Sequence, residues 1–229
     1  MRFKFREFLP VGILLAALCV CAAVALAAYV DADRRLPTNI GYSLEGEELA
    51  EVVARNSPLI RHVCLSPNAD FPRKDEIKKI TIHHMADNDL SIERLGEVFA
   101  EKDRRASANY AVGIDGGIAL YVEEKDRAWT SSSPENDHQA VTIEVANDEI
   151  GGDWHVGDKS YEALIELCVD ICQRNGIEEL VWTGDETGSL TIHKFFREDT
   201  ECPGPYLESR MPDIAEEVTR RLHDQEGNT

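Results

Sequence analysis

The sequence predicts an α/β domain, of the α+β kind, in which a mixed central sheet is flanked by helices. Short β-branched runs alternate along the chain with amphipathic helical patterns, and this alternation is typical of strands and helices layered in one domain. The turn sequence Asp115-Gly116-Gly117 lies between two apolar runs, which is a strong hairpin signal. A long apolar segment at the N-terminus precedes this domain.

The N-terminal segment has the pattern of a transmembrane or signal sequence. Arg2, Lys4 and Arg6 precede an uninterrupted apolar run over residues 9–30. At about 1.5 Å per residue this run can cross a bilayer, and its basic flank favours a cytoplasmic N-terminus with the domain outside. Two interpretations stay open. The length favours an uncleaved single-pass anchor in the cell membrane, whereas a cleavage site at residues 25–27 would release a secreted protein.

The charge excludes some partners. The formal net charge is −19, so the field of the protein repels nucleic acid and anionic lipid, and no nucleic-acid partner is expected. Cys168 and Cys172 are four residues apart in a predicted helix and are interpreted as core residues. An oxidising exterior permits disulfides, but the sequence assigns no pairing to them or to Cys64. We expect a monomer.

The predicted elements follow in order. Residues 31–60 are interpreted as a stalk, with a short helix-prone piece over residues 45–55, and the domain is expected over residues 61–223 with a tail at 224–229. Strands are predicted at residues 80–84, 108–114, 118–122, 141–145 and 180–183. Helices are predicted from an N-cap at Ser91 to about residue 102, over residues 161–174 up to Asn175-Gly176, and over residues 205–222.

Two distant clusters carry candidate metal ligands. The strand Ile80-Thr81-Ile82 ends in His83-His84, and an imidazole at a strand end is held rigidly enough to act as a ligand. More than a hundred residues downstream, His193 precedes Cys202-Pro203-Gly204. One strand histidine with His193 and Cys202 would make three ligands with a fourth position open, the catalytic pattern for zinc. The alternative, structural histidines and a buried cysteine, stays open on the residues alone.

Several motifs together resemble one family. His83-His84 at a strand end, Arg127-Ala128-Trp129, Ile143-Glu144 and the stretch from His193 to Gly204 are similar to the zinc-dependent N-acetylmuramoyl-L-alanine amidases, a group that includes phage lysozyme-type amidases and peptidoglycan recognition proteins. The resemblance covers roughly residues 61–222. Segments 106–121 and 128–147 match amidases of Gram-positive bacteria and their phages in detail.

The resemblance implies a peptidoglycan hydrolase that cleaves the amide bond between N-acetylmuramic acid and the L-alanine of the stem peptide. It implies that Zn²⁺ is held by His83, His193 and Cys202 and activates a water molecule. His84 is less suited as a ligand, because neighbours on a strand face opposite sides. Glu144 matches the carboxylate that some branches of the family use as general base, and Trp129 matches a wall of the substrate groove.

The chain also departs from the family pattern. Many relatives carry a tyrosine in the strand before the Asp-Gly turn, where this chain has Ala108, and some carry a lysine where Thr200 stands. The group that stabilises the oxyanion therefore stays open among Thr200, Thr130 and Asn109. We expect Thr200 to act in catalysis, and Thr130 and Asn109 to contact the substrate with Trp129.

Two alternatives remain at the level of function. Some relatives bind peptidoglycan without cutting it, typically after losing the cysteine ligand, and the presence of Cys202 argues against this receptor-like function. The other alternative is a tethered phage endolysin with the same chemistry, which an alanine-rich anchor would suit.

Overall fold

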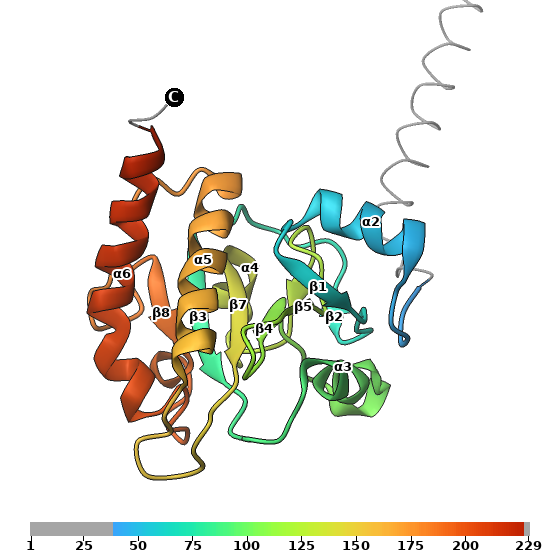
Figure 1. Ribbon diagram of the computed structural model, residues 1–229, viewed down its shortest axis with the longest axis horizontal. Helices are drawn as coiled ribbons and strands as arrows, with labels where there is room; N and C mark the ends of the chain where they lie inside the picture. The colour runs from blue at the N-terminus through green and yellow to red at the C-terminus, as the bar shows by residue number, and fades with distance from the viewer. Residues whose placement is uncertain (1–38, 227–229) are drawn as a thin grey trace, which may run out of the picture. The chain divides into compact units, whose positions relative to one another are not determined.

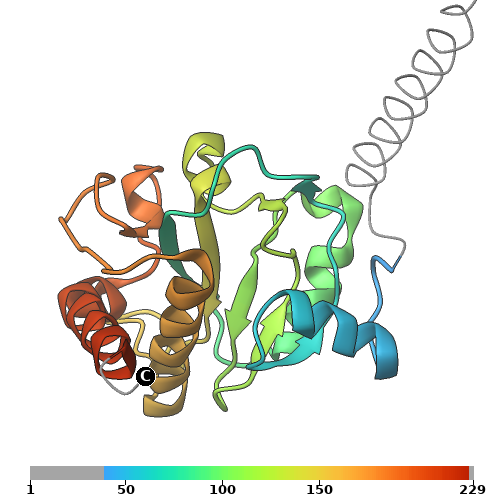
Figure 2. The ribbon, with the colours of Figure 1, turned by 90° about the horizontal axis from the view of Figure 1, so that it is seen from above.

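The structure, a computed structural model, describes residues 39–226 (Figures 1 and 2). The predicted transmembrane or signal segment at residues 9–30 lies outside the described residues, as do residues 31–38 of the predicted stalk and residues 227–229 of the tail. Among the residues that are described, no helix is both long enough and apolar enough to span a membrane.

A mixed six-stranded sheet forms the centre of the domain, as predicted. Its strand order is β1-β5-β4-β7-β3-β8, and only the β4–β5 pair, which the Asp-Gly turn connects, is antiparallel. A separate antiparallel pair is formed by two short strands. The bounds are β1 (Ile60–Val63), β2 (Ala69–Asp70), β3 (Lys79–His84), β4 (Tyr110–Val112), β5 (Ile118–Leu120), β6 (Arg127–Ala128), β7 (Ala140–Val145) and β8 (Leu190–Ile192).

Helices cover the sheet on both faces. α5 and α6 lie side by side against one face, and α4 lies on the opposite side of β7 (Figures 1 and 2). Ser91 caps α3 through its hydroxyl, which accepts a hydrogen bond from the Arg94 amide, and Gly176 ends α5 with a positive φ of 67°. The bounds are α2 (Gly46–Arg55), α3 (Ile92–Ala100), α4 (Pro134–Gln139), α5 (Asp158–Asn175) and α6 (Pro205–Glu226).

Alternation along the strands separates two kinds of interior. Ile80, Ile82 and Ile143 belong to the large apolar core, to which α5 and α6 also contribute. Thr81 and Thr142 are the sequence neighbours of these isoleucines and are equally buried. They belong neither to the large apolar core nor to the smaller apolar cluster around α3. Successive side chains on a strand point to opposite faces, so one face of β3 and β7 is apolar and the other is polar.

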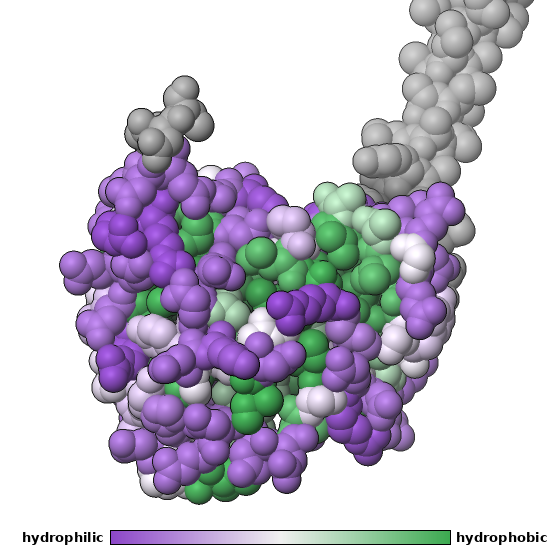
Figure 3. All heavy atoms as spheres, in the orientation of Figure 1, coloured by the Kyte–Doolittle hydropathy of each residue, from purple (hydrophilic) through white to green (hydrophobic). Residues whose placement is uncertain are grey.

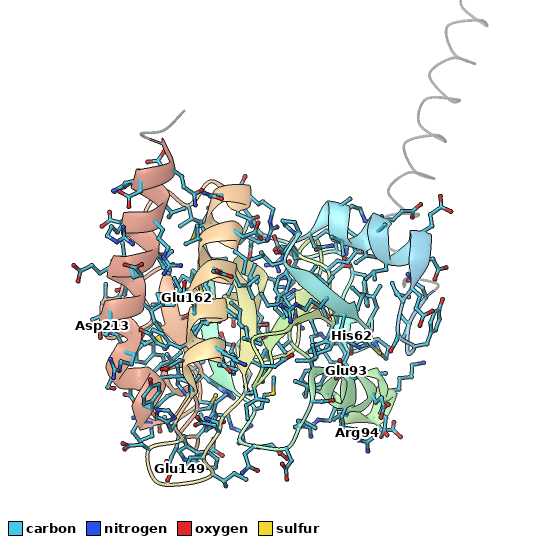
Figure 4. All side chains as sticks on the ribbon, viewed as in Figure 1. His62, Glu93, Arg94, Glu149, Glu162 and Asp213 are labelled. Atoms are coloured by element: carbon cyan, nitrogen blue, oxygen red, sulfur yellow. The ribbon has the colours of Figure 1, made fainter. Side chains whose placement is uncertain are left out.

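The outer surfaces of α5 and α6 are strongly polar. Polar residues cover both helices in the space-filling view, whereas apolar residues are visible between α5 and α2 (Figure 3). Glu162 on α5 and Asp213 on α6 project from these helices (Figure 4), and each pairs with an arginine of α6. Both helices are therefore amphipathic, with one face in the core and one in solvent.

Three predictions of local structure are wrong. Residues 39–60 are not a stalk, because α2 packs against β1 and both Val52 of α2 and the preceding Leu44 are buried in the main core. Residues 180–183 form no strand: although they run beside β8, the one backbone–backbone bond between the two segments joins the Leu190 amide to the Val181 carbonyl. In addition, α6 continues to residue 226, so residues 224–226 belong to the helix and not to a tail.

Replacing Leu44 by Ala tests whether residues 39–60 belong to the domain. Leu44 is 4% exposed, and its truncation should lower the free energy of unfolding by about 2–4 kcal/mol, as for other buried leucines. Urea unfolding measures this change. The exposed Glu48→Ala in α2 is the control and should change stability by less than about 0.5 kcal/mol. An equally small effect of Leu44→Ala would mean that this segment is a stalk after all.

Candidate metal centre

The site begins with the parallel pairing of β3 and β7. In their register His83 lies opposite Glu144, and Ile82 lies opposite Ile143. Both isoleucines are fully buried in the apolar core, so His83 and Glu144 project from the other face. The acid in mid-strand thus faces away from the core, as its apolar neighbours in the sequence indicated.

β8 brings the second histidine to the same end of the sheet. β8 pairs in parallel with β3, with Ile192 opposite Ile82, and His193 follows immediately in the short 3₁₀ helix η2 (His193–Phe195). Because the carboxyl ends of parallel strands meet at one edge, the two imidazoles become neighbours. Their ring centroids lie 4.6 Å apart.

The cysteine reaches this edge from the loop before α6. Cys202 Sγ lies 3.6 Å from His83 Nδ1 and accepts a hydrogen bond of 3.3 Å from the His84 amide. Its backbone is anchored as well, because the Lys194 amide donates to the Cys202 carbonyl at 3.1 Å and the Cys202 amide donates to Thr200 Oγ1 at 3.2 Å. Contacts from the ends of β3 and β8 therefore hold the cysteine in place. The cysteine is 7% exposed.

These three side chains fit a zinc ion. His83, His193 and Cys202 each offer one ligand atom, and these atoms all lie within 4.8 Å of one another. His83 Nε2 and His193 Nε2 are buried without a hydrogen-bond partner, which is costly unless something binds there. Imidazole nitrogen and thiolate sulfur are the donors that zinc prefers. His84 is outside this group and contacts the ring of Trp154 instead, with centroids 4.8 Å apart.

Burial sets the protonation of the ligands. Desolvation, with the charge of the neighbouring histidines, lowers the pKa of His83 well below its usual value. Desolvation also lowers the pKa of His193. Both imidazoles are thus neutral, which is the form that binds metal. Burial raises the pKa of the Cys202 thiol, so a cation is needed to hold it as a thiolate.

A cleft of about 800 Å³ opens over the three ligands and Glu144. Glu144 Oε2 is buried and has no hydrogen-bond partner. Desolvation raises the pKa of Glu144 to about 8, although the charge of Arg104 opposes the shift. A carboxyl group with a pKa near neutrality, next to metal ligands, is suited to moving a proton.

Three more predicted residues line this cleft, namely Trp129, Thr130 and Thr200. Trp129 Nε1 donates a hydrogen bond of 2.9 Å to Asp70, which orients the indole. Thr130 Oγ1 donates its hydrogen to the Ser107 carbonyl at 2.7 Å. Thr200 Oγ1 instead accepts from the Cys202 amide. Its hydroxyl hydrogen is not used in that bond and can serve a ligand in the cleft.

The prediction that Asn109 contacts the substrate is wrong. Asn109 is fully buried and does not line the cleft. Its Nδ2 donates to the Val122 carbonyl at 3.0 Å, and its Oδ1 accepts from the Thr142 amide at 3.1 Å. The side chain thus joins β7 to the segment after β5. The sequence could not show this, because the direction of the side chain depends on the exact start of β4.

Sequence reasoning noted Arg127 only as part of a motif and missed the other basic residues of the cleft. In a chain with a net charge of −19, four arginines line it: Arg104, Arg105, Arg127 and Arg197. Arg127 pairs with Asp70 at 2.9 Å and Arg197 with Asp199 at 2.5 Å. The adjacent pair Arg104-Arg105 stands out in an acidic sequence and could have indicated a basic part of the site. The cleft is consequently less acidic than the rest of the surface.

The fold and the site together define an α/β protein with three candidate metal ligands at the carboxyl edge of its sheet. A family model described as N-acetylmuramoyl-L-alanine amidase matches residues 73–205, which is more than half of the chain. The chain belongs to the N-acetylmuramoyl-L-alanine amidase family. The resemblance inferred from the sequence is therefore confirmed. No curated protein sequence matches the chain.

Solved structures share the fold. The catalytic domain of XlyA superimposes with a TM-score of 0.54 at 15% identity, covering 68% of this chain and 97% of that one. A mutant endolysin from Bacillus subtilis gives 0.53 at 15% identity, covering 68% and 96%. A selenomethionine derivative of AmpD gives 0.51 at 19% identity, covering 67% and 93%. At these identities the likeness shows the fold.

Replacing Glu144 by Gln should raise the thermal midpoint of the metal-free protein, and should do so more at pH 9 than at pH 5. The pKa of Glu144 rises from an ordinary 4.5 to about 8 on folding. The folded state therefore holds this proton more tightly than the unfolded state, and stability is lost as the pH rises through that window. Glutamine does not titrate. Thermal unfolding with a chelator between pH 5 and pH 9 measures the difference, and a pH-independent gap would contradict it.

Proposed function

We propose that the protein is a zinc-dependent hydrolase that cleaves the amide bond between N-acetylmuramic acid and the L-alanine of the peptidoglycan stem peptide. One observation carries the proposal: Glu144, with its buried and unpartnered Oε2, shares a cleft with the ligand set His83, His193 and Cys202. Membership of the amidase family supports the choice of bond.

In this mechanism His83, His193 and Cys202 would hold the ion. Zn²⁺ bound there supplies a Lewis acid that polarises the scissile carbonyl and lowers the pKa of water to about 7. Glu144 Oε2 accepts the proton of the attacking water and delivers it to the leaving amine of L-alanine. The raised pKa of the carboxyl group favours this delivery, because a strongly acidic group would retain the proton poorly.

The cleft residues bind and orient the substrate. Trp129, fixed by Asp70, forms a wall against which an acyl or sugar group can pack. Thr200 is the better oxyanion donor of the two threonines, because the Thr130 hydroxyl hydrogen is already donated to Ser107. Asn109 takes no part, since it lies outside the cleft.

The N-terminal segment supports a proposal about location. The apolar run over residues 9–30 would place the catalytic domain outside the cytoplasmic membrane, either tethered or secreted after cleavage. Membrane fractionation and sequencing of the mature N-terminus distinguish the two forms.

Digestion of purified peptidoglycan tests the function. Mass spectrometry should show new free L-alanine amino termini, and chelation should abolish them. Glu144→Gln and Cys202→Ser should each lower the rate by at least about 100-fold, because each removes a group that acts in the transition state. Glu166→Gln, an exposed acid on α5, is the control and should be fully active.

Other products would contradict this proposal. Release of new reducing ends without free L-alanine termini would identify a glycosidase. Zinc-dependent binding of peptidoglycan without cleavage would identify a receptor-like protein.

A further inference from the structure

We propose that Trp154 is a positioning residue of the metal centre. Its side chain lies between the loop that carries Cys202 and the strand end that carries His83, and it holds these ligands at metal-binding spacing before an ion arrives. The inference rests on the proposed function in one respect, namely that His83, His193 and Cys202 bind zinc. No step of the hydrolysis itself is assigned to Trp154.

Trp154 packs directly on the backbone next to Cys202. Gly204 has a φ of 87°, and a Cβ added to it would lie 2.6 Å from Trp154 Cβ and 3.0 Å from Trp154 Cγ. The 2.6 Å separation is too short for any side chain at position 204, so the Trp154 side chain, from its Cβ to the edge of the indole, occupies the space that glycine leaves open. The Tyr206 amide donates to the Asp153 carbonyl at 2.9 Å, which attaches the same two segments a second time.

On its other side Trp154 contacts the end of β3. Its indole meets the His84 ring edge-on, with an interplanar angle of 74°. The fully buried Asn147 adds a polar link, because its Nδ2 donates to the Trp154 carbonyl at 2.8 Å and its Oδ1 accepts from the Ala86 amide at 3.2 Å. The His84 amide in turn donates to Cys202 Sγ. The end of β3, Trp154 and the Cys202 loop therefore each contact the other two.

The backbone at Trp154 is held in an unusual conformation. Its φ of 54° lies in the left-handed region, which bulky residues rarely adopt. Two backbone bonds fix it, from the Trp154 amide to the Gly151 carbonyl at 2.9 Å and from the Asp148 amide to the His155 carbonyl at 3.0 Å. The loop lies at the lower edge of the view, where Glu149 is labelled (Figure 4). Such strain persists where the surroundings over-determine it, and it is concentrated at functional sites.

These contacts predict a specific energetic role. Ligands that are already in place lose little conformational freedom when the ion binds, so preorganisation raises affinity. Removal of the indole would leave the Cys202 loop with fewer contacts to β3. The three ligands would remain present but would be less well placed, and the metal affinity would fall without loss of any ligand.

Zinc affinity of the detergent-purified full chain tests the role. Competition with a chromophoric chelator should show that Trp154→Ala weakens zinc binding by about 10- to 100-fold, the usual effect of losing a residue that orients ligands. Trp154→Phe keeps an aromatic ring and should weaken binding less, which provides a second variant if the alanine variant does not fold. Leu222→Ala removes a buried core side chain in α6 and should leave the affinity unchanged.

Cobalt substitution separates positioning from a general loss of stability. At saturating Co²⁺, the visible absorption bands of Trp154→Ala should differ from those of the wild type, whereas Leu222→Ala should reproduce the wild-type bands. Unchanged bands and unchanged zinc affinity in both Trp154 variants would overturn this inference alone. Wild-type protein whose zinc affinity does not change on Cys202→Ser would overturn the proposed function together with it.

Discussion

The parallel pairing of β3 with β7 holds both the apolar core and the candidate site in place. Its register sets Ile82 opposite Ile143 in the apolar core and His83 opposite Glu144 on the other face. A slip of one residue would turn the imidazole and the carboxyl group into the core and the isoleucines into the cleft. Such a slip would remove the isoleucines from the core, which is unfavourable. Their burial therefore also stabilises the geometry of the site.

The electrostatics of the site follow from that placement. Burial lowers the pKa of His83 and raises the pKa values of Glu144 and the Cys202 thiol, so without an ion the cluster is uncharged near neutral pH. A divalent cation would reverse these shifts for the thiol and the acid, and metal binding would release protons. The deep, desolvated part of the cleft thus favours the binding of one positive ion. The protein as a whole is acidic.

Much of the architecture could be predicted from the sequence because its signals are local. The β-branched run at residues 80–82, the hairpin turn at residues 115–117 and the glycine after α5 each specify a backbone conformation by their own chemistry. The wrong predictions concern residues whose structure depends on distant partners. Leu44 and Val52 form part of the core because their segment packs against β1. Residues 180–183 have strand-like composition but only one backbone–backbone bond to β8.

The residue types of the site and the family that the chain resembles could be read from the amino-acid sequence alone, since both are properties of residue identity and spacing. Which of these side chains meet is a property of the folded chain. The fold brings His83, His193 and Cys202 together across more than a hundred residues, places Thr200 in the cleft and Asn109 outside it, and seats Trp154 on Gly204. The physical reason is that strand register and loop packing are collective properties, and no local pattern encodes the direction in which a given side chain points.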